Sequence, residues 1–294
     1  MNVRIHFFRD RKSNINIKRI YEFFDDDIFK YSQQDKYIAF KYIHPQLDIK
    51  ATFAFVKHNV VKEIYTLSTA YTNLNFFVEF PLIQSDYFLN DILTVVERMV
   101  KRFGLFYYLD LNKDIEFFSK KDLFDTILDS RDRLVSIDEL TRAREKLITP
   151  SKRLFEICEY QRLVPSLATY FKGQVDVPEY KFYRHVPSDQ FVTSVVWEEG
   201  KPTVFPKHVD YIELIFSDST LPVMIPAEKV WDKIHRFLAL LPDFVDTTRI
   251  LKPGTQTKKA QKYTEGFKAY AISELEFEVF QLSNVLDERN QGIE

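Results

Sequence analysis

The sequence predicts an α+β protein of two halves, each with a mixed or antiparallel sheet and amphipathic helices packed on it. Three observations lead to this prediction. Alternating apolar and polar runs occur in both halves, and proline-flanked amphipathic helical patterns follow them. Between the halves the alternation disappears and only helical patterns remain. We therefore expect an N-terminal α+β domain (1–112), a helical connector (113–172) and a C-terminal α+β domain (173–294).

The clearest part of the sequence is the stretch 73–110, which predicts a strand, a helix and a second strand. Residues 74–80 alternate between apolar and polar positions, as a strand buried on one face does. Ser85 can cap the following helix, and Gly104 supplies the left-handed residue that ends it. A short apolar run follows at 105–109. We expect the helix to cross over a sheet that contains both strands.

The other N-terminal elements are predicted from the same two periodicities. They are a strand at 3–8, a helix at 15–24 capped by Ser13 or Asn14, a hairpin of strands at 37–43 and 49–56, and a strand at 60–67. The resulting order, β-α-β-β-β-β-α-β, is compatible with a ferredoxin-like arrangement that carries an extra hairpin.

The connector predicts three helices. They follow Ser119, the capping box Ser136–Glu139, and the pair Pro150 and Ser151. The C-terminal half then predicts irregular chain at 174–188, strands at 191–197, 209–216 and 221–225, a helix from Pro226 through Leu241 that Pro242 closes, a loop at 252–262, a strand at 271–280 and a frayed tail at 287–294. Both halves contain a strand, a proline and an amphipathic helix in that order, so an internal duplication stays open.

Composition argues against several classes of protein. Lys and Arg total 41 and Asp and Glu total 43, so the net charge is −2 and the chain has no overall basic field. Cys158 is the single cysteine, which excludes an intrachain disulfide and a cysteine-based zinc site. We find neither a signal peptide pattern nor an apolar run of about 18 residues that would span a membrane. These features predict a cytoplasmic protein.

The usual signatures of catalytic and metal sites are missing from the sequence. The six histidines are scattered, and Asp25, Asp26 and Asp27 lack the glycine and glutamate spacing of a calcium loop. Cys158 and the serines have no nucleophile motif around them, and glycines are too few for a phosphate-binding loop. We therefore predict no catalytic, cofactor-binding or metal-binding residues.

Two sets of residues nevertheless suggest alternative functions. A basic loop could contact a phosphate backbone, although we expect it to be an ordinary solvated loop. Acidic residues flank the predicted C-terminal strands, where paired carboxylates could act as acid and base. The loop residues are Lys252, Lys258, Lys259 and Lys262, beside Tyr263, and the strand-end carboxylates are Glu198, Glu199, Asp210 and Glu213.

The sequence does not establish a biological role. We expect a non-enzymatic, cytoplasmic protein-interaction or regulatory protein that binds a protein partner or a second copy of itself, because aromatic residues are abundant (16%) and reactive clusters are missing. The first alternative is a nucleic-acid-binding module that uses the loop 252–262. The second alternative is an enzyme with a strand-end carboxylate site in the C-terminal half.

Overall fold

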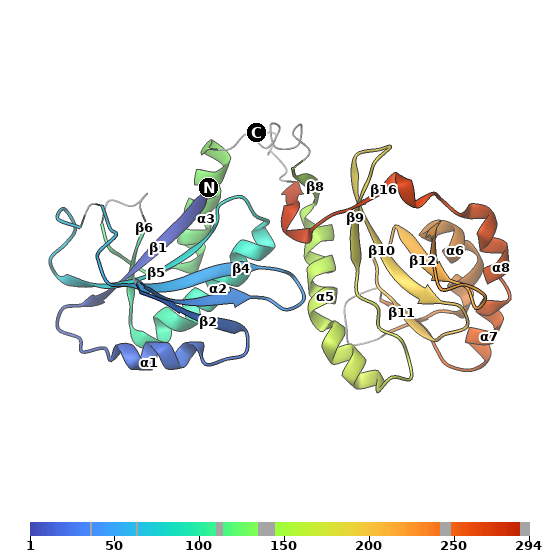
Figure 1. Ribbon diagram of the computed structural model, residues 1–294, viewed down its shortest axis with the longest axis horizontal. Coiled ribbons are helices and arrows are strands. Elements are labelled where there is room, and N and C mark those ends of the chain that lie inside the picture. Colours follow the sequence, from blue (N-terminus) through green and yellow to red (C-terminus); the bar gives the residue numbers. More distant parts are fainter. Residues whose placement is uncertain (36, 63, 110–113, 135–144, 242–247, 289–294) are drawn as a thin grey trace. The chain divides into compact units, whose positions relative to one another are not determined.

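Internal contacts divide the chain into two units, Met1–Arg142 and Ala143–Glu294, in this computed structural model (Figure 1). The structure describes every residue except 36, 63, 110–113, 135–144, 242–247 and 289–294. Each unit contains helices and sheets with mostly antiparallel pairing, so the predicted α+β class is confirmed. The division of the chain into three parts stays a prediction.

A seven-stranded antiparallel sheet forms the N-terminal unit, in the order β2-β3-β4-β5-β1-β6-β7. Its strands are β1 (Asn2–Asp10), β2 (Phe29–Gln34), β3 (Tyr37–Ile43), β4 (Lys50–Val56), β5 (Tyr71–Pro81), β6 (Phe106–Leu109) and β7 (Glu116–Phe117). The helices are α1 (Ile17–Tyr21), α2 (Asp86–Phe103) and α3 (Lys120–Leu134), and the 3-10 turn η1 (Glu22–Phe24) follows α1.

The strand, helix and strand expected at 73–110 are confirmed as β5, α2 and β6. The Ser85 hydroxyl accepts a hydrogen bond from the Phe88 amide at 3.2 Å and so caps α2. Gly104 ends the helix with φ +60°, a conformation that glycine adopts without steric cost. β5 and β6 both pair antiparallel with β1, one on each side. α2 therefore connects two strands that run in the same direction.

Aromatic rings fill the space on one side of this sheet. Phe24 from η1 stacks on Phe40 of β3 with ring centroids 4.5 Å apart, and Phe55 of β4 stacks on Phe76 of β5 at 4.1 Å. The neighbouring Phe77 points to the opposite face and is also buried. Burial of rings on both faces stabilises the sheet by roughly 25 cal/mol for each Å² of apolar surface that leaves water.

Three N-terminal details differ from the sequence prediction. The strand expected at 60–67 is wrong, because the described residues there form bends and turns, with Val61 and Leu67 packed against Phe8 under the loop. β2 was not expected. The first helix is capped by the Asn16 side chain, rather than by Ser13 or Asn14, and its last residues form the 3-10 turn η1.

The main sheet of the C-terminal unit has five strands in the order β13-β12-β10-β9-β16. β10 and β12 are parallel, and the other neighbours are antiparallel. These strands are β9 (Lys181–His185), β10 (Gln190–Glu198), β12 (Tyr211–Ile215), β13 (Pro222–Pro226) and β16 (Phe277–Val279). A three-stranded sheet is formed by β11 (Thr203–Phe205), β15 (Arg249–Leu251) and β14 (Ala239–Leu240), and a parallel pair by β8 (Leu147–Pro150) and β17 (Val285–Glu288).

The helices of this unit are α5, α6, α7 and α8, with short 3-10 turns after or between them. α5 opens at Ser151 after Pro150, as predicted, and α6 opens after Pro226. In the described parts of the chain, every helix is too short or too polar to cross a membrane. The elements are α5 (Ser151–Phe171), α6 (Ala227–Ile234), η2 (His235–Phe237), α7 (Thr255–Gln261), α8 (Thr264–Phe267), η3 (Lys268–Tyr270), η4 (Glu274–Glu276) and η5 (Leu282–Asn284).

Several predicted boundaries in the connector and the C-terminal half are wrong. Strands β7 and β8 lie inside the stretch expected to be helical, and β9 lies inside the stretch expected to be irregular. The helix after Pro226 ends before β14, the loop at 252–262 contains α7, and only β16 is strand within 271–280. Asp287 and Glu288 belong to β17 rather than to a frayed tail. The rest of that tail and most of the helix expected after the capping box lie outside the described residues.

His6 predicts how the stability of the N-terminal unit depends on pH. It is 2% exposed in β1, and burial, with a contribution from Arg4, lowers its pKa to about 4 from the usual 6.5. Between these values the unfolded chain binds a proton that the folded chain does not. Stability that is present above pH 6.5 is therefore lost as the pH falls towards 4, by up to about 3 kcal/mol.

The variant His6→Gln should show a weaker loss of stability between pH 6.5 and pH 4 in urea unfolding followed by circular dichroism. His58→Gln removes an exposed histidine of the same unit and serves as the control, with the wild-type pH dependence expected. An unchanged pH dependence in His6→Gln would contradict the assignment.

Candidate functional sites

Most of the predicted basic loop forms the helix α7, and its four lysines are all exposed. Thr257 and Ala260 anchor α7 in the C-terminal unit, because both side chains are buried. The Thr257 hydroxyl donates a hydrogen bond to the Lys252 carbonyl at 2.7 Å and closes the turn before the helix. We call the exposed side chains of Lys252, Lys258, Lys259 and Lys262 the α7 basic face.

Glycine is required where the chain enters α7. Gly254 has φ +101° and ψ −132°, a backbone region that side-chain-bearing residues rarely adopt. Together with the buried Thr257, this turn fixes where α7 begins. Lys258 and Lys259 therefore project from the folded helix and Lys262 from its C-terminal cap, which reduces the entropy these side chains lose when they bind a partner.

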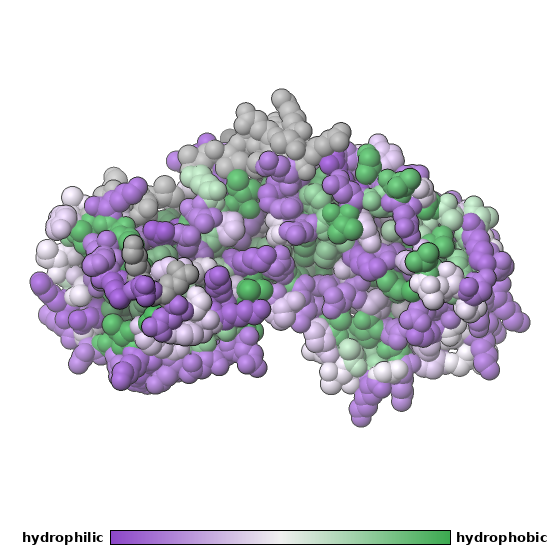
Figure 2. Space-filling model, in the orientation of Figure 1, coloured by the Kyte–Doolittle hydropathy of each residue, from purple (hydrophilic) through white to green (hydrophobic). Residues whose placement is uncertain are grey.

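The charge of this region is unbalanced. From Thr248 to Thr264 the sequence contains five cations, the four lysines and Arg249, and no Asp or Glu. Within the part of the chain that the structure describes, none of these five side chains takes part in an ion pair. Hydrophilic residues cover the surface over α7 (Figures 1 and 2). Among the described residues, the positive charge of the α7 basic face is therefore left without an ion-pair partner.

A second positive group lies beside this face, on η2. Arg236 is exposed, donates a hydrogen bond to the Tyr263 hydroxyl, and stacks its guanidinium over the Phe237 ring at 4.9 Å and the Tyr263 ring at 5.5 Å. Such stacking holds a guanidinium in place without neutralising it. Sequence reasoning missed Arg236, because it is distant from the lysines in sequence and only the fold brings it beside Tyr263, and it left out Arg249, which lies shortly before Lys252.

The strand-end carboxylates lie apart. Residues of β10 and β12 pair in parallel, with Ser194 opposite Tyr211 and Glu198 opposite Ile215, so Asp210 and Glu198 lie near opposite ends of the two strands. Glu198 forms an exposed ion pair with Lys201. Asp210 forms an ion pair with Arg153 and also accepts a hydrogen bond from the Thr193 amide.

Glu199 and Glu213 are engaged at two further places. The Glu199 carboxylate accepts hydrogen bonds from the Thr264 hydroxyl and the Ser217 amide, and so ties α8 to the end of β10. Although burial alone would raise the pKa of Glu199, these hydrogen bonds outweigh it and lower the pKa. The carboxylate therefore stays ionised and acts as a structural acceptor.

Glu213 lies at the centre of a buried polar cluster in the C-terminal unit. It is 3% exposed and accepts hydrogen bonds from Lys181 at 2.5 Å, Ser194 at 2.5 Å and Tyr183 at 2.9 Å. Burial and the adjacent Glu213 charge raise the pKa of Tyr183, so its hydroxyl stays protonated and able to donate. Three donors thus compensate one buried carboxylate across β9, β10 and β12, which is a structural arrangement.

A histidine also pairs with a carboxylate in this unit. The carboxylate is that of Glu156 on α5, and the histidine is His208. The Glu156 carboxylate contacts the His208 ring nitrogen at 2.5 Å and Lys207 at 3.0 Å. Burial alone would raise the pKa of Glu156, but the hydrogen bonds from His208 and Lys207 outweigh it and lower the pKa. This pair connects α5 to the chain between β11 and β12.

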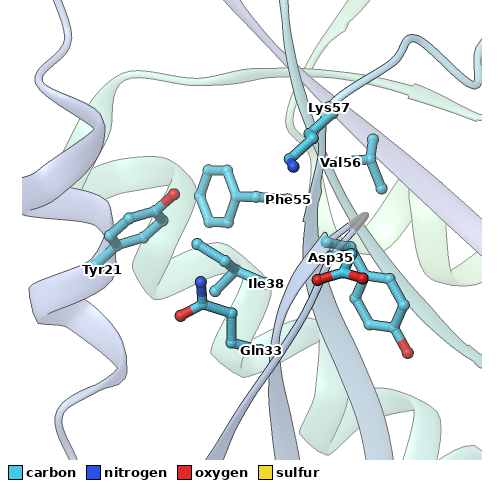
Figure 3. A pocket seen from close by; sticks show the side chains of 8 residues that line it. Tyr21, Gln33, Asp35, Ile38, Phe55, Val56 and Lys57 are labelled. Atoms are coloured by element: carbon cyan, nitrogen blue, oxygen red, sulfur yellow. The ribbon is translucent and has the colours of Figure 1, made fainter.

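A pocket of about 530 Å³ lies beside α1 and the ends of β2, β3 and β4 in the N-terminal unit (Figure 3). Tyr21 and Phe55 form an apolar wall, with their rings edge to face at 4.8 Å. Gln33, Asp35 and Lys57 on the rim are exposed. One positive and one negative group on an open rim do not favour a particular ligand, and sequence reasoning did not single out these residues.

We also searched the described residues for side chains that could bind a metal ion together. Among the residues that the structure describes, no three His, Cys, Asp or Glu side chains converge as a metal site would require. Asp25, Asp26 and Asp27 are all exposed after η1. Cys158 is buried in α5.

Comparison with known proteins gives no further indication of function. The sequence matches no family model, and neither a curated protein nor a solved structure is similar to it. The surfaces described above are therefore the basis for a functional proposal.

The Glu213 cluster predicts a specific loss of stability. Glu213→Gln removes the buried charge that Lys181, Ser194 and Tyr183 surround, and it should lower the free energy of unfolding by about 1–3 kcal/mol. Both tryptophans, Trp197 and Trp231, lie in the C-terminal unit, so urea unfolding followed by tryptophan fluorescence reports on this unit.

Glu198→Gln is the matched control for this experiment. Glu198 is exposed and paired with Lys201, so its replacement should change the free energy of unfolding by no more than about 0.5 kcal/mol. Equal effects of the two substitutions would show that the Glu213 cluster has no special structural role.

Proposed function

We propose that this protein is a non-enzymatic binding protein whose C-terminal unit holds a polyanionic partner on the α7 basic face. One observation carries the proposal: five neighbouring cations stand on an acid-free stretch of chain, and among the described residues none is paired with a carboxylate. Uncompensated, exposed and pre-positioned charges favour a partner with regularly repeated negative charges.

The overall charge of −2 is compatible with this proposal. Exposed charges are screened over about 8–10 Å at physiological salt, so acidic residues elsewhere on the surface do not cancel a local positive patch. Release of condensed counterions from a polyanion then supplies most of the binding free energy.

Several finer expectations from the sequence remain part of the proposal. A cytoplasmic location and a regulatory role are compatible with a protein that acts by binding, and a protein partner or a second copy can bind to other surfaces.

The N-terminal order β4-β5-β1-β6, with helices between β1 and β2 and between β5 and β6, supports a ferredoxin-like arrangement with added strands. An enzymatic role is less well supported, because each strand-end carboxylate is engaged in a separate structural contact.

The lysines of α7 can be tested together. In Lys258→Ala/Lys259→Ala/Lys262→Ala, elution from heparin should move to clearly lower salt. With a labelled 12-nucleotide strand as the polyanion, the plot of log affinity against log salt concentration should also become shallower, by about 0.7–0.9 for each lost phosphate contact. Fluorescence anisotropy over a series of NaCl concentrations measures this slope.

The control Lys30→Ala/Lys41→Ala/Lys57→Ala removes the same formal charge from exposed lysines of the N-terminal unit. It should elute from heparin like the wild type. The proposal fails when the wild type passes heparin at low salt without retention, or when both triple variants lose retention equally.

A further inference from the structure

A pocket lined by aromatic rings and cations lies in the same unit, and its Arg249 begins the strand that leads to Lys252 of the α7 basic face. It has a volume of about 390 Å³, and its lining residues are Phe205, Pro206, Lys207, Trp231, Leu238 and Arg249. Two chain segments join it to the basic face. Leu238 directly follows η2, which carries Arg236, and β15 leads from Arg249 to Lys252.

Trp231 forms the accessible aromatic wall of this pocket. Its ring is half-buried on α6, and the fully buried Phe205 ring meets it edge to face at 5.1 Å. Phe205 packs in the same way against the buried Trp197, at 5.7 Å. These contacts fix the plane of the Trp231 ring, so a ligand that stacks on it finds a rigid surface.

The two cations of the pocket differ in their availability. Lys207 is already paired with Glu156 at 3.0 Å. Arg249 is exposed, and in the described parts of the chain no carboxylate contacts it. Counting only the described residues, the pocket therefore offers one planar apolar surface and one guanidinium without an ion-pair partner.

We propose that the polyanion is a single-stranded nucleic acid, with one base in this pocket on Trp231 and its phosphates on Arg249 and the α7 basic face. This inference rests on the function proposed above, since it identifies the partner of the same face. Stacking of bases on aromatic rings beside a track of cations is how proteins bind single strands without reading their sequence. The bases of a duplex are stacked on one another inside the helix, so none of them is available to stack on Trp231.

An acidic protein segment fits the pocket less well than a single strand does. Aspartate and glutamate side chains can satisfy the lysines and Arg249, but they have no ring to place against Trp231. A nucleotide carries a flat ring and a phosphate in one unit, which matches the pairing of Trp231 with Arg249.

The test compares three probes in fluorescence anisotropy at low salt, with the full chain. The probes are a 12-nucleotide oligothymidylate, an abasic strand of the same length and charge, and a duplex of the same length. We expect the wild type to bind oligothymidylate at least about tenfold more tightly than the abasic strand, because one stacked base is worth roughly 1–3 kcal/mol or 5- to 150-fold. It should also prefer oligothymidylate to the duplex.

Three variants test whether this preference arises in the pocket. Trp231→Ala should abolish the preference for oligothymidylate over the abasic strand while retention on heparin stays. Arg249→Ala replaces an exposed side chain and keeps the aromatic wall, so it tests the same pocket if the tryptophan variant unfolds; it should weaken oligothymidylate binding several-fold. Quenching of tryptophan fluorescence by oligothymidylate should disappear in Trp231→Phe.

The outcomes separate this inference from the proposed function. Equal affinity of the wild type for oligothymidylate and the abasic strand, tighter binding of the duplex, or full oligothymidylate binding by a folded Trp231→Ala protein each overturns the inference. Retention on heparin would still support the α7 basic face in all these cases. Failure of the wild type to bind heparin would overturn both.

Discussion

Pairing of β1 on both of its edges is the constraint on which the N-terminal unit depends. β5 and β6 flank it, and its side chains from Ile5 to Phe8 are all buried, so both faces of the strand must be covered. Because β5 and β6 run in the same direction, their connection has to cross a face of the sheet, and α2 provides this cover. The helix and the central strand thus stabilise one another.

Local signals explain which elements could be predicted. β5, α2 and β6 carry a regular alternation, a serine cap and a terminal glycine, and these signals depend on neighbouring residues only. The apolar residues at 60–67 serve a different purpose, because Val61 and Leu67 cover the core from a loop and need no strand partner. β2 was missed because polar residues interrupt it, and its pairing with β3 supplies the missing stabilisation.

For the candidate site too, some features could be predicted from neighbouring residues in the sequence and others depend on the fold. The lysines of the α7 basic face are visible as a run of charge, but whether they are neutralised depends on the fold, since sequence-distant carboxylates could have paired with them. Trp231, Phe205 and Arg249 come from three separate elements, and only the meeting of α6 with the small sheet makes a pocket of them. Before the fold was known, Trp231 could be assigned only to the apolar side of a helix.

The parallel pairing of β8 with β17 bears on how the chain folds during synthesis. β8 is the first strand of the C-terminal unit and β17 is the last, so the edge of β8 lacks its partner until residues 285–288 have left the ribosome. The N-terminal sheet, by contrast, has all of its strands once residue 117 has emerged. The N-terminal unit can therefore mature early, whereas the C-terminal unit must wait until β17 has been translated.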